Sequence, residues 1–296
     1  MVLKFKLLII SLIITQVACA NKKLEVLIVT GQNNHNWQLT SQAVYGIFNA
    51  SDLFNVTIIQ SPAKGEDMSD FYPDFKQYDL ICLDYNGDYW PKKTQENFVK
   101  YIKKGGGLVL YHASDNAFSK WEAFNEIIGV GGWGHRNEES GPILYWEDNE
   151  VKKDHSPGKG GIHGKAFEYI VHTREPNHPI MKGLPTEWLH TKDELYHSLR
   201  GPAKNVTVLA TAQQDKAEKG SGRQEPVLMT IKYGKGRVFH SVMGHVSSRG
   251  TNTDAVLCTG FVTTLLRGAE WVATGKVKQE LTYKFPDATQ TQKINL

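Results

Sequence analysis

Short hydrophobic runs alternate with helical patterns along the first half of the chain. The runs have the length and the β-branched content of strands buried on both faces, and they cover residues 24–30, 56–59, 79–84 and 108–111. Between them, apolar residues recur at helical spacing, within residues 43–48 and 94–104. Strands that alternate with helices predict an α/β fold, a doubly wound and mostly parallel sheet flanked by helices.

This regular pattern stops at residue 129. From 129 to 164 glycine, tryptophan, histidine and acidic residues dominate, and a loop of that length in a compact domain is either functional or disordered. Further strand-like runs follow at residues 167–171, 206–210, 227–233 and 237–243. Gly234-Lys235-Gly236 separates the last two, which predicts a C-terminal antiparallel hairpin. A final amphipathic helix is expected over 254–273, with a polar tail on the surface.

The N-terminus has the pattern of a secretory signal. Lys4 and Lys6 precede an apolar run over 7–14, which is too short to span a bilayer, and Ala18-Cys19-Ala20 resembles a cleavage site. We therefore expect a signal peptide over 1–20, one domain over 21–276 and a tail over 277–296, in an exported protein that is periplasmic or secreted. Cys19 leaves a second possibility open, a membrane-anchored lipoprotein, although Gln16 stands where such signals usually have leucine.

Composition narrows the class of partner. The net charge of +3 is small and mixed along the chain, whereas nucleic-acid-binding proteins usually carry a basic stripe, so no nucleic-acid partner is expected. Outside the signal only Cys82 and Cys258 remain, which indicates neither a disulfide framework nor a cysteine metal site. Eleven histidines and seven tryptophans, many in loops, favour a small-molecule carbohydrate as the ligand, because aromatic side chains stack on sugar faces.

Polar side chains follow the predicted parallel strands at the points where these strands end. In open parallel sheets ligands bind beyond the carboxyl ends of the strands. This rule selects candidates from four segments: His35 and Trp37, Asp84, His112 with Ser114 and Asp115, and His245.

His112 stands at a strand-to-helix turn, after the run Gly105-Gly106-Gly107 and the strand over 108–111. Hydrolases of the α/β class place a nucleophile at such a turn, but histidine does not act there as serine or cysteine does. No G-x-S-x-G motif is present, which argues against an ordinary acyl-transfer triad. A base, a hydrogen-bond donor and a metal ligand all remain open as roles for His112.

Two local clusters add further candidates. Asp193, Glu194 and Tyr196 lie in one, and Trp133 and His135 in the other, within the irregular segment. Histidines and carboxylates from distant segments can form a catalytic pair or a metal site. No H-E-x-x-H spacing is present, so a divalent ion, zinc or similar, is a hypothesis, with four candidate ligands: His35, His112, His135 and His245. A buried structural network is the alternative for His112, His245 and Glu194, and a helix N-cap is the alternative for Asp115.

These motifs together resemble the ThuA-like family, named for trehalose utilisation. The matching stretches cover most of the chain, namely 29–31 with His35 and Trp37, 105–114, Gly134-His135, 178–180 with 184–185, 193–196, and 234–239 with Gly244-His245. The resemblance implies a fold similar to that of class I glutamine amidotransferases. It also implies that His112 replaces the nucleophile of those enzymes and that His245 lies near their triad histidine, so glutamine hydrolysis is not expected.

The resemblance further suggests a hydrolase, lyase or isomerase that acts on an oxidised (3-keto) glycoside. A ketone acidifies the neighbouring C–H bonds, so a base can start elimination of the glycosidic oxygen. His112 or His245 would be the base and Glu194 the acid, with His35 and His135 as enolate donors or metal ligands. The expected substrate-binding residues are Trp37, Asp115, Trp133, Asp193 and Tyr196. The alternative is a non-catalytic carbohydrate-binding protein on the same fold.

Overall fold

The computed structural model describes residues 22–296. Five parallel strands form one half of the central sheet, in the order β2-β1-β3-β4-β13. They are Phe54–Gln60, Leu24–Thr30, Leu80–Leu83, Gly107–Leu110 and Gly236–Ser241. The middle of β1 and all of β3 and β4 are buried, as expected of strands covered on both faces. The predicted α/β class, a parallel central sheet flanked by helices, is confirmed.

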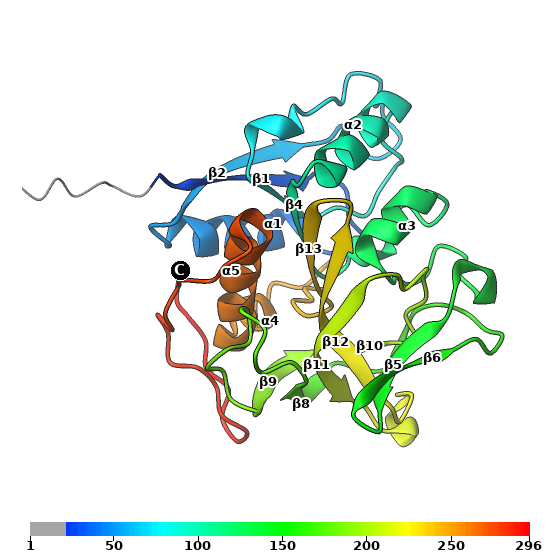
Figure 1. Cartoon of the computed structure of the whole chain (residues 1–296), viewed down its shortest axis with the longest axis vertical. Coiled ribbons are helices and arrows are strands. Elements are labelled where there is room, and N and C mark those ends of the chain that lie inside the picture. The colour runs from blue at the N-terminus through cyan, green and yellow to red at the C-terminus, as the bar shows by residue number, and fades with distance from the viewer. Residues whose placement is uncertain (1–21) are drawn as a thin grey trace, which may run out of the picture.

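Helices cover both faces of this parallel half (Figure 1). One face carries α1 (Trp37–Asn49), α4 (Asp254–Leu257) and α5 (Thr259–Thr274), and the other carries α2 (Lys92–Lys103) and α3 (Glu122–Ile128). Asn36 caps α1, because its side chain accepts the N–H of Leu39. The apolar side of α1, with Val44, Ile47 and Phe48, packs into the core.

The other half of the sheet is antiparallel and more extensive than the sequence indicates. After β13 the order continues β12-β11-β8-β9, made of Gln224–Tyr233, Val206–Gln213, Phe167–Thr173 and Glu187–Asp193. The proline-punctuated stretch before residue 194 thus contains a complete strand, β9. Its edge position explains why prolines lie close by, because an edge strand leaves one row of N–H groups unpaired.

The segment 129–164 contains regular structure that its lack of periodicity does not predict. β5 (Ile143–Glu147) and β6 (Glu150–Asp154) form a hairpin, and β7 (Ile162–His163) pairs with β10 (Tyr196–His197). Asp148 and Asn149 form the hairpin turn, with φ of 52° and 61°. Two consecutive positive φ values are what a tight two-residue hairpin requires, and Asp and Asn tolerate them.

The C-terminal tail is tied to the domain rather than merely lying on it. The N–H of Leu189 in β9 donates to the carbonyl of Asp287 (2.7 Å), and the N–H of Ile294 donates to the carbonyl of Leu257 (3.0 Å). The side chain of Ile294 is buried. The expected signal peptide and Cys19 lie outside the described residues. Within residues 22–296, no helix is both long and apolar enough to cross a membrane.

Candidate metal and acid–base site

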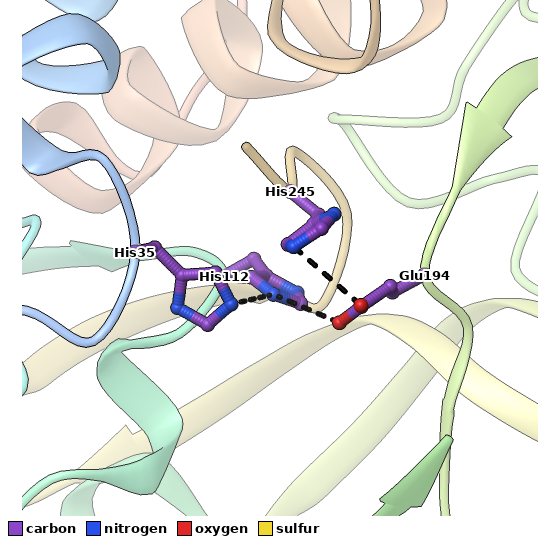
Figure 2. A group of neighbouring side chains, drawn as sticks. All are labelled: His35, His112, Glu194 and His245. Atoms are coloured by element: carbon purple, nitrogen blue, oxygen red, sulfur yellow. Dashed lines mark hydrogen bonds and ion pairs between the residues drawn. The ribbon is translucent and has the colours of Figure 1, made fainter. Parts of the chain in front are cut away.

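Three histidines converge from the ends of three parallel strands (Figure 2). His35 follows β1, His112 follows β4 and His245 follows β13. The Nε2 atoms of His35 and His112 are 3.2 Å apart, and the His245 ring lies 4.9 Å and 5.0 Å from the other two rings. The strand-end rule thus selected residues that the fold brings together.

Glu194 completes the group from the antiparallel half, just after β9. Its Oε1 lies 3.5 Å from Nε2 of His245, and its Oε2 lies 3.8 Å from Nε2 of His112. Each of the four side chains offers one ligand atom, and these atoms all lie within 4.8 Å of one another. His135 is not part of this group. It lies beside Arg136 and Ser119, in a separate surface pocket.

The hydrogen bonds of the rings determine where their lone pairs point. Nδ1 of His112 lies 3.1 Å from the carbonyl of Val242, so Nδ1 carries the proton and Nε2 carries the lone pair. Nδ1 of His35 lies 3.3 Å from Oδ1 of Asn33, which sets the same tautomer. Two lone pairs therefore face each other at close range; the Tyr196 hydroxyl is placed to donate to that of His112, and a bound cation would engage both.

Burial also keeps the imidazoles of His35 and His112 neutral. Desolvation, with a contribution from neighbouring His245, lowers the pKa of His35 to about 4. Desolvation and the nearby His35 and His245 hold the pKa of His112 well below its usual range. The pKa of Glu194 is raised, mainly by desolvation. Neutral imidazole is the form that binds a metal ion, so His35 and His112 need lose no proton to bind one near neutral pH.

Two of the four, His35 and Glu194, line a pocket of about 350 Å³, and their ligand atoms lie within 4.8 Å of those of His112 and His245. The other lining residues are Asn34, Asn86, Asn116, Trp133, Gly134, His163 and Tyr196. The Trp133 and Tyr196 rings pack 4.6 Å apart, and the Tyr196 hydroxyl lies 2.8 Å from Nε2 of His112. Among the described residues that line this pocket there is no lysine or arginine.

Four lining residues were missed in the sequence: His163, Asn34, Asn86 and Asn116. Asn34 and Asn86 follow the first and third strands, so the strand-end rule could have selected them, and they hydrogen-bond each other at 2.7 Å. Asn116 lies directly beyond Asp115. No local signal marks His163, because it reaches the pocket through the β7–β10 pairing, opposite Tyr196.

Three expected substrate-binding residues do not line this pocket. Trp37 begins α1. Asp115 is fully buried within the 3-10 helix Ser114–Asn116 and makes no capping hydrogen bond, so the N-cap interpretation is wrong as well. Asp193 is also buried, and its carboxylate is fully engaged by protein donors. Both carboxylates lie behind the pocket because the residues next to them, Asn116 and Glu194, face it.

Asp84, another strand-end candidate, supports the site through hydrogen bonds to residues near His35. Its carboxylate accepts hydrogen bonds from Thr40 and Ser41 in α1 and from Asn33, at 2.5, 2.8 and 3.0 Å. Asn33 in turn contacts His35. Asp84 therefore fixes α1 and the His35 loop rather than capping the helix that follows it.

Trp133 is held in the pocket wall by an unusual loop. Trp133, Gly134 and His135 all have positive φ, at 50°, 57° and 68°. The buried guanidinium of Arg136 donates to the carbonyl of Ala117 (2.8 Å) and to Asn125 (3.0 Å). The N–H of Trp133 donates to the carbonyl of Gly160, and the N–H of Gly160 donates to the carbonyl of Arg136, both at 2.7 Å. These two bonds hold together the two ends of the excursion over 137–159, the segment that contains the β5–β6 hairpin.

Comparison with known proteins identifies the family. The family model for ThuA, described as trehalose utilisation, matches residues 25–272. A crystal structure of a ThuA-like protein from Parabacteroides merdae is 49% identical, with a TM-score of 0.90, over 92% of this chain and 98% of that one. A ThuA-like protein from Bacteroides uniformis shares the fold at 20% identity, with a TM-score of 0.55, over 86% and 93% of the two chains. No curated protein sequence matches this chain. With a family model that covers most of its length and a close structural relative, this chain belongs to the ThuA family.

Proposed function

We propose that this protein is a metal-assisted acid–base enzyme that acts on a carbohydrate and cleaves or rearranges an oxidised (3-keto) glycoside. The observation that carries the proposal is the convergence of three imidazoles and one carboxylate, two of which, His35 and Glu194, line a pocket. Two of the imidazoles are oriented by hydrogen bonds at Nδ1, so that their Nε2 atoms face a common point.

The donor set suits a divalent ion such as zinc. Nε2 of His35, His112 and His245 would hold it, a three-histidine set that zinc accepts, with the Glu194 carboxylate beside the ion. When bound, such an ion polarises a carbonyl oxygen and stabilises the negative charge that develops there. Ring nitrogens held by Asn33 and Val242 match the usual support of metal-binding histidines.

Glu194 and Tyr196 are the groups suited to move protons. The raised pKa of Glu194 brings its carboxyl closer to neutral pH, where a group can both accept and donate a proton. In a 3-keto glycoside, its carboxylate would remove the proton from the carbon next to the ketone and then return it to the departing glycosidic oxygen. With Nε2 of His112 bound to an ion, the Tyr196 hydroxyl 2.8 Å away would be free to donate a hydrogen bond to the substrate oxygen.

The pocket wall supports a neutral, hydroxyl-rich ligand. Asn34, Asn86 and Asn116 offer amide donors and acceptors, and Trp133 offers an aromatic face. Among the described lining residues there is no lysine or arginine, the side chains that usually pair with a phosphate or a carboxylate. The family description, trehalose utilisation, agrees with a neutral sugar.

The proposal also covers where the protein is located and which fold family it is related to. The N-terminal signal supports an exported protein, periplasmic or secreted, with a lipid anchor at Cys19 as the alternative. We also propose a relationship to the class I glutamine amidotransferase fold, with His112 in the place of the nucleophile.

The test is metal analysis joined to a turnover assay. The mature protein, His112→Ala, His245→Ala and the control His155→Ala, which removes an exposed histidine outside the pocket, are assayed for bound zinc. All four are then incubated with 3-keto disaccharides, with and without chelator. We expect about one ion per chain and chelator-sensitive turnover in the wild type and the control, and neither in the two site variants.

The outcomes separate the competing functions. Saturable sugar binding without turnover, unchanged in His112→Ala, would support the non-catalytic carbohydrate-binding protein instead. Turnover that neither chelator nor His112→Ala reduces would exclude the metal-assisted mechanism.

A further inference from the structure

We propose that Asp193 is a positioning residue that sets the geometry of Glu194 and His245, a role that rests on the proposed metal site. Its side chain is completely buried, yet both carboxylate oxygens are fully used. Oδ1 accepts the backbone N–H groups of Glu194 (2.8 Å) and His245 (3.0 Å). One oxygen atom thus holds the peptide groups of two site residues that lie 51 positions apart in the sequence.

The second oxygen fixes the orientation of the carboxylate. Oδ2 accepts the N–H of Gly244 (2.8 Å) and Nε2–H of His190 (2.9 Å). His190 lies in β9, three residues before Asp193, and is itself fully buried, with its ring 5.2 Å from that of Tyr169. With two donors on each oxygen, the carboxylate has little freedom to rotate.

The loop that carries His245 depends on this anchor. Gly244 has a φ of 103°, and a Cβ at that position would lie 2.9 Å from the ring of Phe261, so the chain is turned sharply against α5. The peptide groups of Gly244 and His245 then point at Asp193. Within residues 22–296 these N–H groups have no other acceptor, so loss of the carboxylate leaves two peptide N–H groups unpaired.

The other two histidines do not use this anchor. His35 is oriented by Asn33 and His112 by the carbonyl of Val242. Asp193 therefore controls one half of the proposed metal site, Glu194 and His245, and leaves the other half in place. A change at Asp193 should weaken metal binding without abolishing it.

The experiment compares Asp193→Asn with Asp154→Asn. The control residue Asp154 is also an ion-paired carboxylate. It lies at the end of β6, pairs with Arg223 and is not part of the pocket lining. Zinc affinity is measured by competition with a chromophoric chelator at a temperature where thermal scans show every variant folded. We expect a 10–100-fold weaker affinity in Asp193→Asn, the usual range for a group that orients metal ligands, and no change in the control. His190→Gln, which keeps an N–H donor, should restore most of the affinity that His190→Ala loses.

A second readout does not depend on the metal. Hydrogen exchange of the Glu194, Gly244 and His245 amides in the metal-free protein should accelerate at least 10-fold in Asp193→Asn. If the wild type binds zinc and Asp193→Asn binds it with equal affinity, the inference is overturned and the proposed function stands. A wild type that binds no zinc refutes the metal site, and unchanged exchange of the three amides then overturns the positioning role as well.

Discussion

The parallel and antiparallel halves of the sheet contribute to the site in different ways. The parallel half supplies His35, His112 and His245, each at the carboxyl end of a strand, where open α/β sheets usually bind ligands. The antiparallel half supplies Glu194 and Tyr196 from the connection that follows its edge strand, β9. In the proposed mechanism, the parallel half would present the nitrogen ligands, and the antiparallel half would present the groups that move protons.

The largest expected effect separates proton transfer from metal binding. Glu194→Gln keeps the size and one oxygen of the side chain but cannot carry a proton. Turnover of a 3-keto disaccharide should fall about 10²–10⁴-fold, the usual contribution of a general acid–base group. Zinc should still bind, because the three histidines remain. Full activity in a zinc-loaded Glu194→Gln variant would contradict the division between the two halves.

The pH dependence of the free energy of unfolding should also distinguish the halves, because the antiparallel half contains a buried carboxyl, Glu225 in β12. Burial raises the pKa of this carboxyl to about 7, and only one of its oxygens has a hydrogen bond, from the N–H of Ser198. Between about pH 4.5 and 7 the unfolded chain ionises at this position and the folded chain does not. The free energy of unfolding therefore falls as the pH rises through this range, by on the order of 3 kcal/mol.

Glu225→Gln removes this dependence, so the variant should gain stability over the wild type at pH 8 but not at pH 4. Urea unfolding at the two pH values measures the difference. Asp84, the buried carboxyl of the parallel half, accepts three hydrogen bonds, which offset part of the desolvation that raises its pKa. Identical pH profiles for the wild type and Glu225→Gln would show that Glu225 ionises normally in the folded protein.

The smallest expected effect concerns the two tryptophans. Trp133 lines the pocket, whereas Trp37 begins α1 outside it. Trp133→Ala should weaken binding of a neutral disaccharide by about 1 kcal/mol, or roughly fivefold, and Trp37→Ala should leave it unchanged. Isothermal titration of both variants measures this. Equal losses in the two would show that the aromatic wall does not contact the sugar.

The parallel half could be predicted well from the sequence. Its strands are uniformly apolar and separated by helical periodicity, and its histidines follow directly from the strand ends. The antiparallel half was harder, because β8 and β9 alternate between buried and part-exposed positions, and β9 ends in polar residues. Glu194 was found only as part of a local acidic cluster, and its neighbour Asp193 was assigned to the substrate although it faces inward.

The remaining errors have a common physical cause. Whether Asp193 or Glu194, and Asp115 or Asn116, points into the pocket depends on the turn after a strand, and one residue of difference reverses the direction of a side chain. His163 depends on a two-residue pairing between segments 33 positions apart, which no local pattern encodes. His135 was grouped with the other histidines by residue type alone, while the positive φ of its loop turns it to another surface.

The closed base of the excursion over 137–159 has a practical consequence for protein engineering. The hydrogen bonds between Trp133, Gly160 and Arg136 fix the pocket wall independently of the hairpin beyond them. Its tip, Asp148-Asn149, is an exposed, tight turn that joins β5 and β6. Loop tips of this kind accept inserted sequence. A fluorescent domain or an affinity tag placed there would report on the protein while leaving the wall built on Trp133 intact.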